Sequence, residues 1–145
     1  MGLYYEEFEV GGEFKSGGRT VTEADIVNFA GISGDFNPLH MDEEFAKNTI
    51  YEKRVAHVML PLAILTGLSQ SLGILNDTII AFLGFEWKFR APVFIGDTLY
   101  LLQHVASKWE TSKRDRGIVV FDSKLINQKD EVVQEGSRTV MVRRK

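Results

Sequence analysis

The hydrophobic period of this chain changes once, near residue 79, and that change restricts the folds it can adopt. Before it, the segment from Ala56 to Leu72 carries apolar side chains around nearly every side of a helical turn, which predicts a helix buried almost all round. After it, apolar residues recur at every second position, as in strands with one buried face. Helices followed by strands predict an α+β fold in which helices cover one face of an antiparallel sheet.

Four segments after residue 79 show the two-residue period. In the first, Phe85, Trp87 and Phe89 point to one face while the intervening charged residues point to the other. The other strands are expected at residues 98–109, 118–126 and 132–142. Gly96-Asp97 marks the turn between the first two strands, and Asn127–Asp130 forms a hairpin turn between the last two. We therefore expect a sheet of about five strands, curled around the long helix.

Capping signals predict two shorter helices ahead of the long one. The hydroxyl of Thr22 can accept a hydrogen bond from the amide of Asp25, which begins a helix that the glycines of Gly31–Gly34 end. A second, short helix is expected at residues 43–47, with Asp42 as its N-cap.

Composition excludes several classes of chemistry. The 145 residues include no cysteine and only three histidines, which excludes a thiol nucleophile, a redox dithiol and a cysteine-based metal centre. A net charge of -3 without a long basic run argues against nucleic acid as a partner. The longest apolar stretch, residues 58–65, is far shorter than the roughly 20 residues of a membrane span. We expect one domain over residues 1–145, located in the cytoplasm because the N-terminus shows no secretory signal.

Two expected features predict self-association. A sheet of this size has edge strands with unpaired backbone groups, and a helix that is apolar all round needs more cover than one small sheet supplies. We therefore expect a homodimer in which the sheet is extended.

The most concentrated polar segment follows the first expected helix. It holds a carboxylate, Asp35, and an imidazole, His40, five positions apart. An extended strand would separate them by about 16 Å and a helix would set them on different faces, so they can meet only if the loop turns. Gly34, Asn37 and Pro38 favour such a turn. From these residues alone, a catalytic pair and a loop that only satisfies its own backbone both stay open.

This segment also resembles the signature of a known family. The string Ser-Gly-Asp-x-Asn-Pro-Leu-His-x-Asp at 33–42, followed by Arg-Val-Ala-His at 54–57, is similar to that of the MaoC-like dehydratases, or (R)-specific enoyl-CoA hydratases. A second string, Phe-x-x-Pro-Val-x-x-Gly-Asp-Thr-Leu at 89–99, resembles the family's next strand and turn. The resemblance spans about residues 14–142. It implies a single hotdog domain, usually dimeric, in which a curled antiparallel sheet wraps a long apolar helix.

The resemblance implies a reaction as well. Family members add water to a trans-2-enoyl thioester, or catalyse the reverse dehydration, with coenzyme A or an acyl carrier protein as part of the substrate and with no metal or other cofactor. The resemblance makes Asp35 and His40 the catalytic pair. These side chains suit the reaction, because it needs a base for the water that attacks C3 and an acid that protonates C2. Asp35 is then the principal base, and His40 positions the same water and relays its proton.

Three further residues enter through the resemblance as oxyanion or substrate-binding residues. In the family, a glycine after the histidine of an Ala-His-Gly segment donates its backbone amide to the enolate oxygen. Val58 stands at that position here, so its amide is the expected donor, with a β-branched side chain beside it. Asn37 is expected to hold the loop in shape, and His57 to close the first turn or form a wall of the cleft.

Two other functions stay open from the sequence. A hotdog acyl-thioesterase would release a free thiol without consuming the enoyl group. A non-catalytic acyl-thioester binding protein would bind coenzyme A esters without turnover, and Val58 at the glycine position motivates this alternative.

Overall fold

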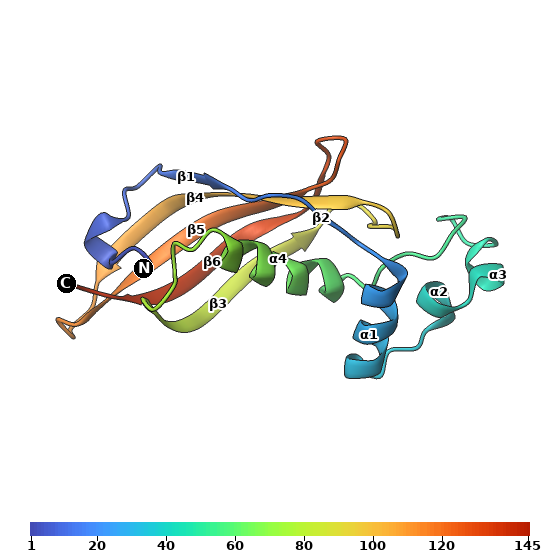
Figure 1. The fold of residues 1–145 in the computed structure, drawn as a ribbon, viewed down its shortest axis with the longest axis horizontal. Coiled ribbons are helices and arrows are strands. Elements are labelled where there is room, and N and C mark those ends of the chain that lie inside the picture. Colours follow the sequence, from blue (N-terminus) through green and yellow to red (C-terminus); the bar gives the residue numbers. More distant parts are fainter.

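In the computed structural model, which describes residues 1–145, a curled antiparallel sheet wraps around one long helix (Figure 1). The strands are β1 (Glu13–Lys15), β2 (Arg19–Thr20), β3 (Ile79–Phe89), β4 (Thr98–Glu110), β5 (Arg116–Ile126) and β6 (Val132–Arg143). The helices are the 3-10 turn η1 (Tyr5–Glu7), α1 (Glu23–Ser33), α2 (Pro38–Met41), α3 (Glu43–Ala46) and the long α4 (Met59–Ser71). The α+β hotdog architecture expected from the sequence is confirmed.

The sheet runs in the order β1-β4-β5-β6-β3, and β2 pairs with the first residues of β4. The expected turn at Gly96-Asp97 therefore does not join neighbouring strands, because β5 and β6 lie between β3 and β4. Consecutive hairpins pair β4, β5 and β6, which leaves β3 to pair with the free side of β6. The turn instead binds the segment ahead of α1, since the N–H of Gly96 donates to the carbonyl of Val21 at 2.8 Å.

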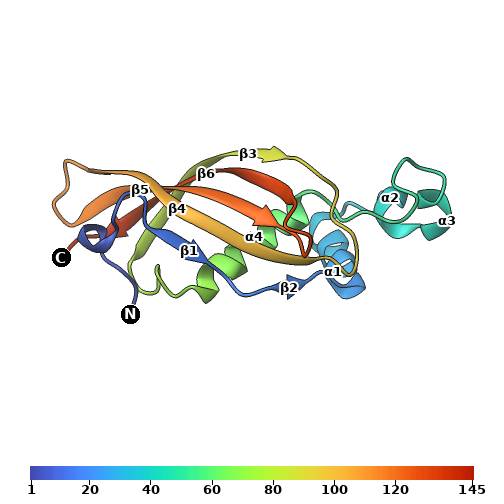
Figure 2. The same ribbon diagram turned by 90° about the horizontal axis from the view of Figure 1, so that it is seen from above.

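The short helices form where their caps predict. The hydroxyl of Thr22 accepts from the amide of Asp25, and α1 ends at Gly34 with a left-handed φ of 77°. The helix thus continues through Gly31, which was expected to help end it. Asp42 caps α3 as expected, whereas α2 was not expected. Both α2 and α3 lie beyond the end of the sheet, on the side away from the two termini (Figure 2).

The long helix is not buried all round, so that expectation is wrong for a single chain. Leu60, Ile64, Leu65 and Leu68 pack against the sheet and are almost inaccessible to solvent. The opposite side of α4 is an exposed stripe made of Met59, Ala63, Thr66, Gly67 and Gln70. One sheet can cover only one side of a helix, which explains the difference. None of the helices has the length and apolar character that a membrane crossing requires.

The edge strand β3 also exposes apolar side chains. Those of Phe82, Leu83, Phe85 and Phe89 are each close to half exposed, although β3 lies at the end of the sheet with a free edge. A free apolar edge and an exposed helix stripe form the kind of surface that a further chain covers.

Gly136 of β6 is paired with Trp87 of β3 and has no room for a side chain. A Cβ atom at residue 136 would collide with the carbonyl oxygen of Glu86 and lie 2.7 Å from Cε3 of Trp87. We expect Gly136→Ala to lower the free energy of unfolding by about 1–3 kcal/mol, as overpacking does. The matched control is Gly84→Ala in β3, where an added Cβ meets nothing within 4 Å. Urea denaturation of both variants measures the effect, and equal stabilities would contradict the prediction.

Candidate active site

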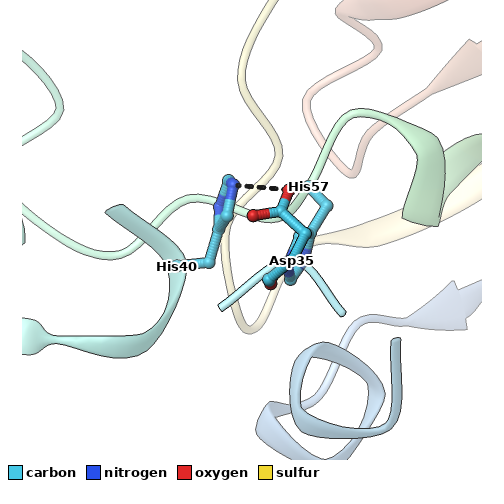
Figure 3. A group of neighbouring side chains, drawn as sticks. All are labelled: Asp35, His40 and His57. Atoms are coloured by element: carbon cyan, nitrogen blue, oxygen red, sulfur yellow. Dashed lines mark hydrogen bonds and ion pairs between the residues drawn. The ribbon is translucent and has the colours of Figure 1, made fainter. Parts of the chain in front are cut away.

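Three polar side chains, those of Asp35, His40 and His57, meet beside the start of α4 (Figure 3). Asp35 comes from the loop after α1, His40 from α2, and His57 from the segment that leads into α4. Their carboxylate and imidazole ligand atoms all lie within 4.8 Å of one another. The loop therefore turns as its residue types predict and brings the two expected partners together.

Local hydrogen bonds hold this turn. Gly34 takes the left-handed conformation that a Cβ would disfavour. The N–H of Asn37 donates to Oδ1 of Asp35 at 3.2 Å, and the N–H of Leu39 donates to Oδ1 of Asn37 at 3.0 Å. Asn37 thus caps α2 and fixes the path of the loop, which sets the side chains of Asp35 and His40 facing each other.

The ring of His40 is oriented by a backbone carbonyl. Its Nδ1 lies 2.6 Å from the carbonyl oxygen of Val55, and because a carbonyl only accepts, Nδ1 must carry a proton. In the neutral ring, Nε2 then offers a lone pair, 3.9 Å from Oδ2 of Asp35. This distance is too long for a direct hydrogen bond. The Asp35 carboxylate is half exposed, whereas the His40 side chain is mostly buried, so two proton acceptors face one solvent-accessible space.

His57 packs behind Asp35 and His40. It is 3% exposed, and its Nε2 donates to the backbone carbonyl of Asp35 at 2.8 Å. Its ring stacks on that of His40 with centroids 3.9 Å apart, and Phe29 lies against it at 4.9 Å. The remaining nitrogen, Nδ1, is fully enclosed and has no hydrogen-bond partner. His57 therefore holds the loop and the His40 ring in place and presents no free polar atom to the open space.

The start of α4 carries free backbone donors. Val58 is the N-cap residue, its side chain is exposed, and its N–H makes no hydrogen bond. The positive end of the helix dipole lies at this point. The carbonyl of Val58 accepts from Nε2 of Gln134, whose Oε1 accepts from Nε1 of Trp87, each at 2.9 Å. Gln134 thus ties the helix start to the sheet. Sequence reasoning missed it, although a glutamine in phase with the buried residues of a strand is a detectable signal.

A cavity of about 260 Å³ opens between the start of α4 and the ends of β3 and β6. Most of its lining is apolar, with His40 and Val58 among the lining residues. The lining consists of Leu39, His40, Tyr51, Val55, Ala56, Val58, Pro61, Phe89, Arg90, Ala91, Pro92, Val93 and Gln134. An apolar cavity beside a pair of proton acceptors suits a substrate with an apolar part next to its reacting atoms.

A larger hollow of about 970 Å³ covers the outer face of the sheet, away from Asp35 and His40. Its lining is mainly charged and polar and contains acidic and basic side chains in similar number. His104 lies there, 3.5 Å from Asp122. As expected from its strand position, His104 is a residue of the sheet surface.

An ion-pair network holds Arg54, which directly precedes the cavity-lining residues Val55 and Ala56. Arg54 bonds to Glu23 of α1 at 2.8 Å and to Glu43 of α3 at 3.1 Å. The hydrogen bond to Glu23 is the main cause that raises the pKa of Arg54. Because Val55 follows directly and its carbonyl orients His40, this network helps to set the position of the imidazole.

The three clustered residues do not form a typical metal site. His40 Nδ1 and His57 Nε2 each face a backbone carbonyl, and His57 Nδ1 is enclosed. One carboxylate and one open imidazole nitrogen remain, which is fewer than the three protein ligands that a catalytic zinc ion takes.

The sequence of this chain matches those of known proteins over most of its length. Residues 7–125 match the MaoC like domain. An (R)-specific enoyl-CoA hydratase of Rhodospirillum rubrum is 35% identical over 140 residues, which cover 97% of this chain and 92% of that protein. A 3-hydroxybutyryl-CoA dehydratase of Methylorubrum extorquens is 32% identical over 144 residues, 99% of this chain and 86% of that protein.

A solved structure agrees with the sequence relatives. The crystal structure of a MaoC-like dehydratase from Rhodospirillum rubrum superposes with a TM-score of 0.90 at 34% identity, and the match covers 99% of each chain.

Proposed function

Because this chain belongs to the MaoC-like dehydratase family, we propose that it adds water to a trans-2-enoyl-CoA to give an (R)-3-hydroxyacyl-CoA, or catalyses the reverse dehydration. The names of its relatives support a hydratase or dehydratase role. The observation that carries the finer proposal is the pair formed by the Asp35 carboxylate and His40 Nε2, 3.9 Å apart. His40 also lines an apolar cavity that can take an acyl chain.

In this proposal, one water molecule lies against both acceptors. The carboxylate of Asp35 takes a proton from the water as its oxygen attacks C3, and Nε2 of His40 accepts the second O–H and orients the molecule. The proton taken from water is relayed to C2, so the double bond is consumed and no proton is gained or lost. Since the oxidation state of the substrate and water together is unchanged, no redox group is needed, and coenzyme A enters only as part of the substrate.

The thioester oxygen gains negative charge as the enolate forms, and preorganised donors lower the energy of that state. The free N–H of Val58 at the start of α4 is such a donor, and the helix dipole adds to its effect. The Val58 side chain lines the same cavity, so it stands close to the path by which the carbonyl would approach.

Removing the base tests the proposal directly. We expect Asp35→Asn to lower turnover of crotonyl-CoA by about 10²–10⁴-fold, the usual contribution of a general base. The assay follows the loss of enoyl-thioester absorbance. The matched control is Asp122→Asn, because Asp122 also faces a histidine, at 3.5 Å, but lies on the outer face of the sheet.

Unchanged turnover in folded Asp35→Asn protein would contradict the assignment of the base. Release of free thiol without loss of the enoyl group would favour a thioesterase instead. Saturable binding of crotonyl-CoA without any turnover would favour a binding protein.

Shortening the side chain at residue 58 tests the proposed oxyanion donor. We expect kcat/KM for crotonyl-CoA to rise in the order wild type, Val58→Ala, Val58→Gly, because each step opens the approach to an amide that stays in place. Steady-state kinetics of the three proteins gives the order. Equal values would show that the valine side chain does not obstruct the carbonyl.

We also propose that the protein is a homodimer that covers the free edge of β3 and the exposed stripe of α4. Sedimentation should give about twice the 16.4 kDa mass of one chain. Phe82→Lys in β3 should shift the protein toward monomer, because a charge would be buried in the interface. Val10→Lys, an exposed apolar residue before β1, is the matched control. A wild-type monomer at all concentrations would contradict the proposal.

A further inference from the structure

One buried charge lies outside the site described above. Arg138 of β6 is 3% exposed, and its guanidinium reaches into the space between α4 and the sheet. Its Nε donates to Ser123, and its Nη2 donates to Ser69 at 3.3 Å and to Oε1 of Gln103. All three partners are neutral. Buried charges are ordinarily matched by an opposite charge, because desolvation of an unmatched ion is costly.

Nothing in the chain neutralises this charge. Burial alone lowers the pKa of Arg138 to about 10, with no contribution from a neighbouring carboxylate, so the guanidinium stays charged at neutral pH. The aromatic ring of Phe121 lies 5.9 Å from it, and this contact brings no full negative charge.

The cluster also has two unused donors. Nη1 of Arg138 makes no hydrogen bond. Nε2 of Gln103 is fully enclosed and has no partner either. These two side chains are already joined by a hydrogen bond, so the free N–H groups belong to neighbouring residues. What the cluster lacks is an acceptor with negative charge, and a carboxylate supplies two such oxygens.

The strand register connects this cluster to the proposed acyl cavity. Phe89 and Gln134, paired across β3 and β6, both line the cavity. Four pairs further along the same two strands, Phe85 is opposite Arg138. Residues two and four apart on a strand share one face, and four residues span about 13 Å. The half-exposed side chain of Phe85 therefore lies about 13 Å from Phe89 on the same face, with Trp87 between them.

We propose that Arg138 and Gln103 form a carboxylate-binding site about 13 Å from the acyl cavity along this face, so that thioesters whose acyl chain ends in a carboxylate are preferred. This inference rests on the proposed hydratase function. The same chemistry could come from an Asp or Glu side chain of a second copy packed against β3, and the experiment separates these two sources.

The test compares two enoyl-CoA substrates of equal length, one ending in a carboxylate and one in a methyl group, with chains long enough to span the distance. Wild type should favour the carboxylate-ended substrate by about tenfold or more in kcat/KM, because unpaired buried donors discriminate against a group that cannot accept. Arg138→Met should abolish or reverse this preference. Arg143→Met, an exposed arginine of the same strand, should keep it.

A second variant distinguishes loss of the binding site from loss of the fold. Gln103→Glu places a carboxylate beside the guanidinium with almost no change in volume, so it should keep the fold and still lose the preference. Thermal unfolding of each variant checks that the fold is intact. Equal preference in wild type, Arg138→Met and Gln103→Glu, all dimeric, would overturn the inference.

The two sources give different results. If the partner subunit supplies the carboxylate, Arg138→Met and Gln103→Glu should weaken the dimer in sedimentation without changing the substrate preference, and Arg143→Met should not. If wild type turns over no enoyl-CoA, including crotonyl-CoA, the proposed function fails on its own. Calorimetric binding of saturated carboxylate-ended and methyl-ended acyl-CoA then decides: a difference lost in Arg138→Met supports the site, and equal binding with an unaltered dimer overturns it.

Discussion

The packing of α4 against the inner face of the sheet is the interaction on which the rest of the structure depends. Leu60, Ile64 and Leu65 of the helix meet buried leucines of β4 and β5 in one continuous core. Each such side chain stabilises the fold by about 1.5–3 kcal/mol when removed from water. Because this core fixes the helix along the sheet, it also fixes where the helix begins, and the cavity opens at that beginning.

Asp35 and His57 of the polar cluster lie in loops and His40 lies in the short helix α2, and backbone groups hold the side chains in place. Two histidines face carbonyl oxygens, those of Val55 and Asp35, within 2.8 Å. These contacts set which nitrogen of each ring carries a proton, and they leave Nε2 of His40 as the one imidazole acceptor open toward Asp35. The stack of His57 on His40 adds a second constraint on ring orientation. Chemistry that depends on the direction of a lone pair benefits from such fixed rings.

Several unusual features of this chain share one region of the molecule. One sheet leaves part of its apolar surface uncovered. This surface includes the free edge of β3, the exposed stripe of α4 and the half-exposed Phe85, which is paired with Arg138. A single chain of this size cannot enclose a long helix and also pair every strand edge. An acyl chain or a second copy of this chain would cover this apolar surface, and under the proposal above the buried Arg138 charge would favour an acyl chain that ends in a carboxylate.

Local signals in the sequence suffice to predict α1, α3 and α4, the strands β3–β6 and the loop that carries Asp35 and His40. These signals are the hydrophobic period, the Thr22 and Asp42 caps, and the turn residues Gly34 and Asn37. The order of the strands in the sheet, the exposed side of α4 and the partners of the buried polar groups follow only from the folded structure. The physical reason is that these properties depend on contacts between residues far apart in the chain. Gln134 bonds to Val58 across 76 positions, and Arg138 to Ser69 across 69, and no local pattern specifies either bond.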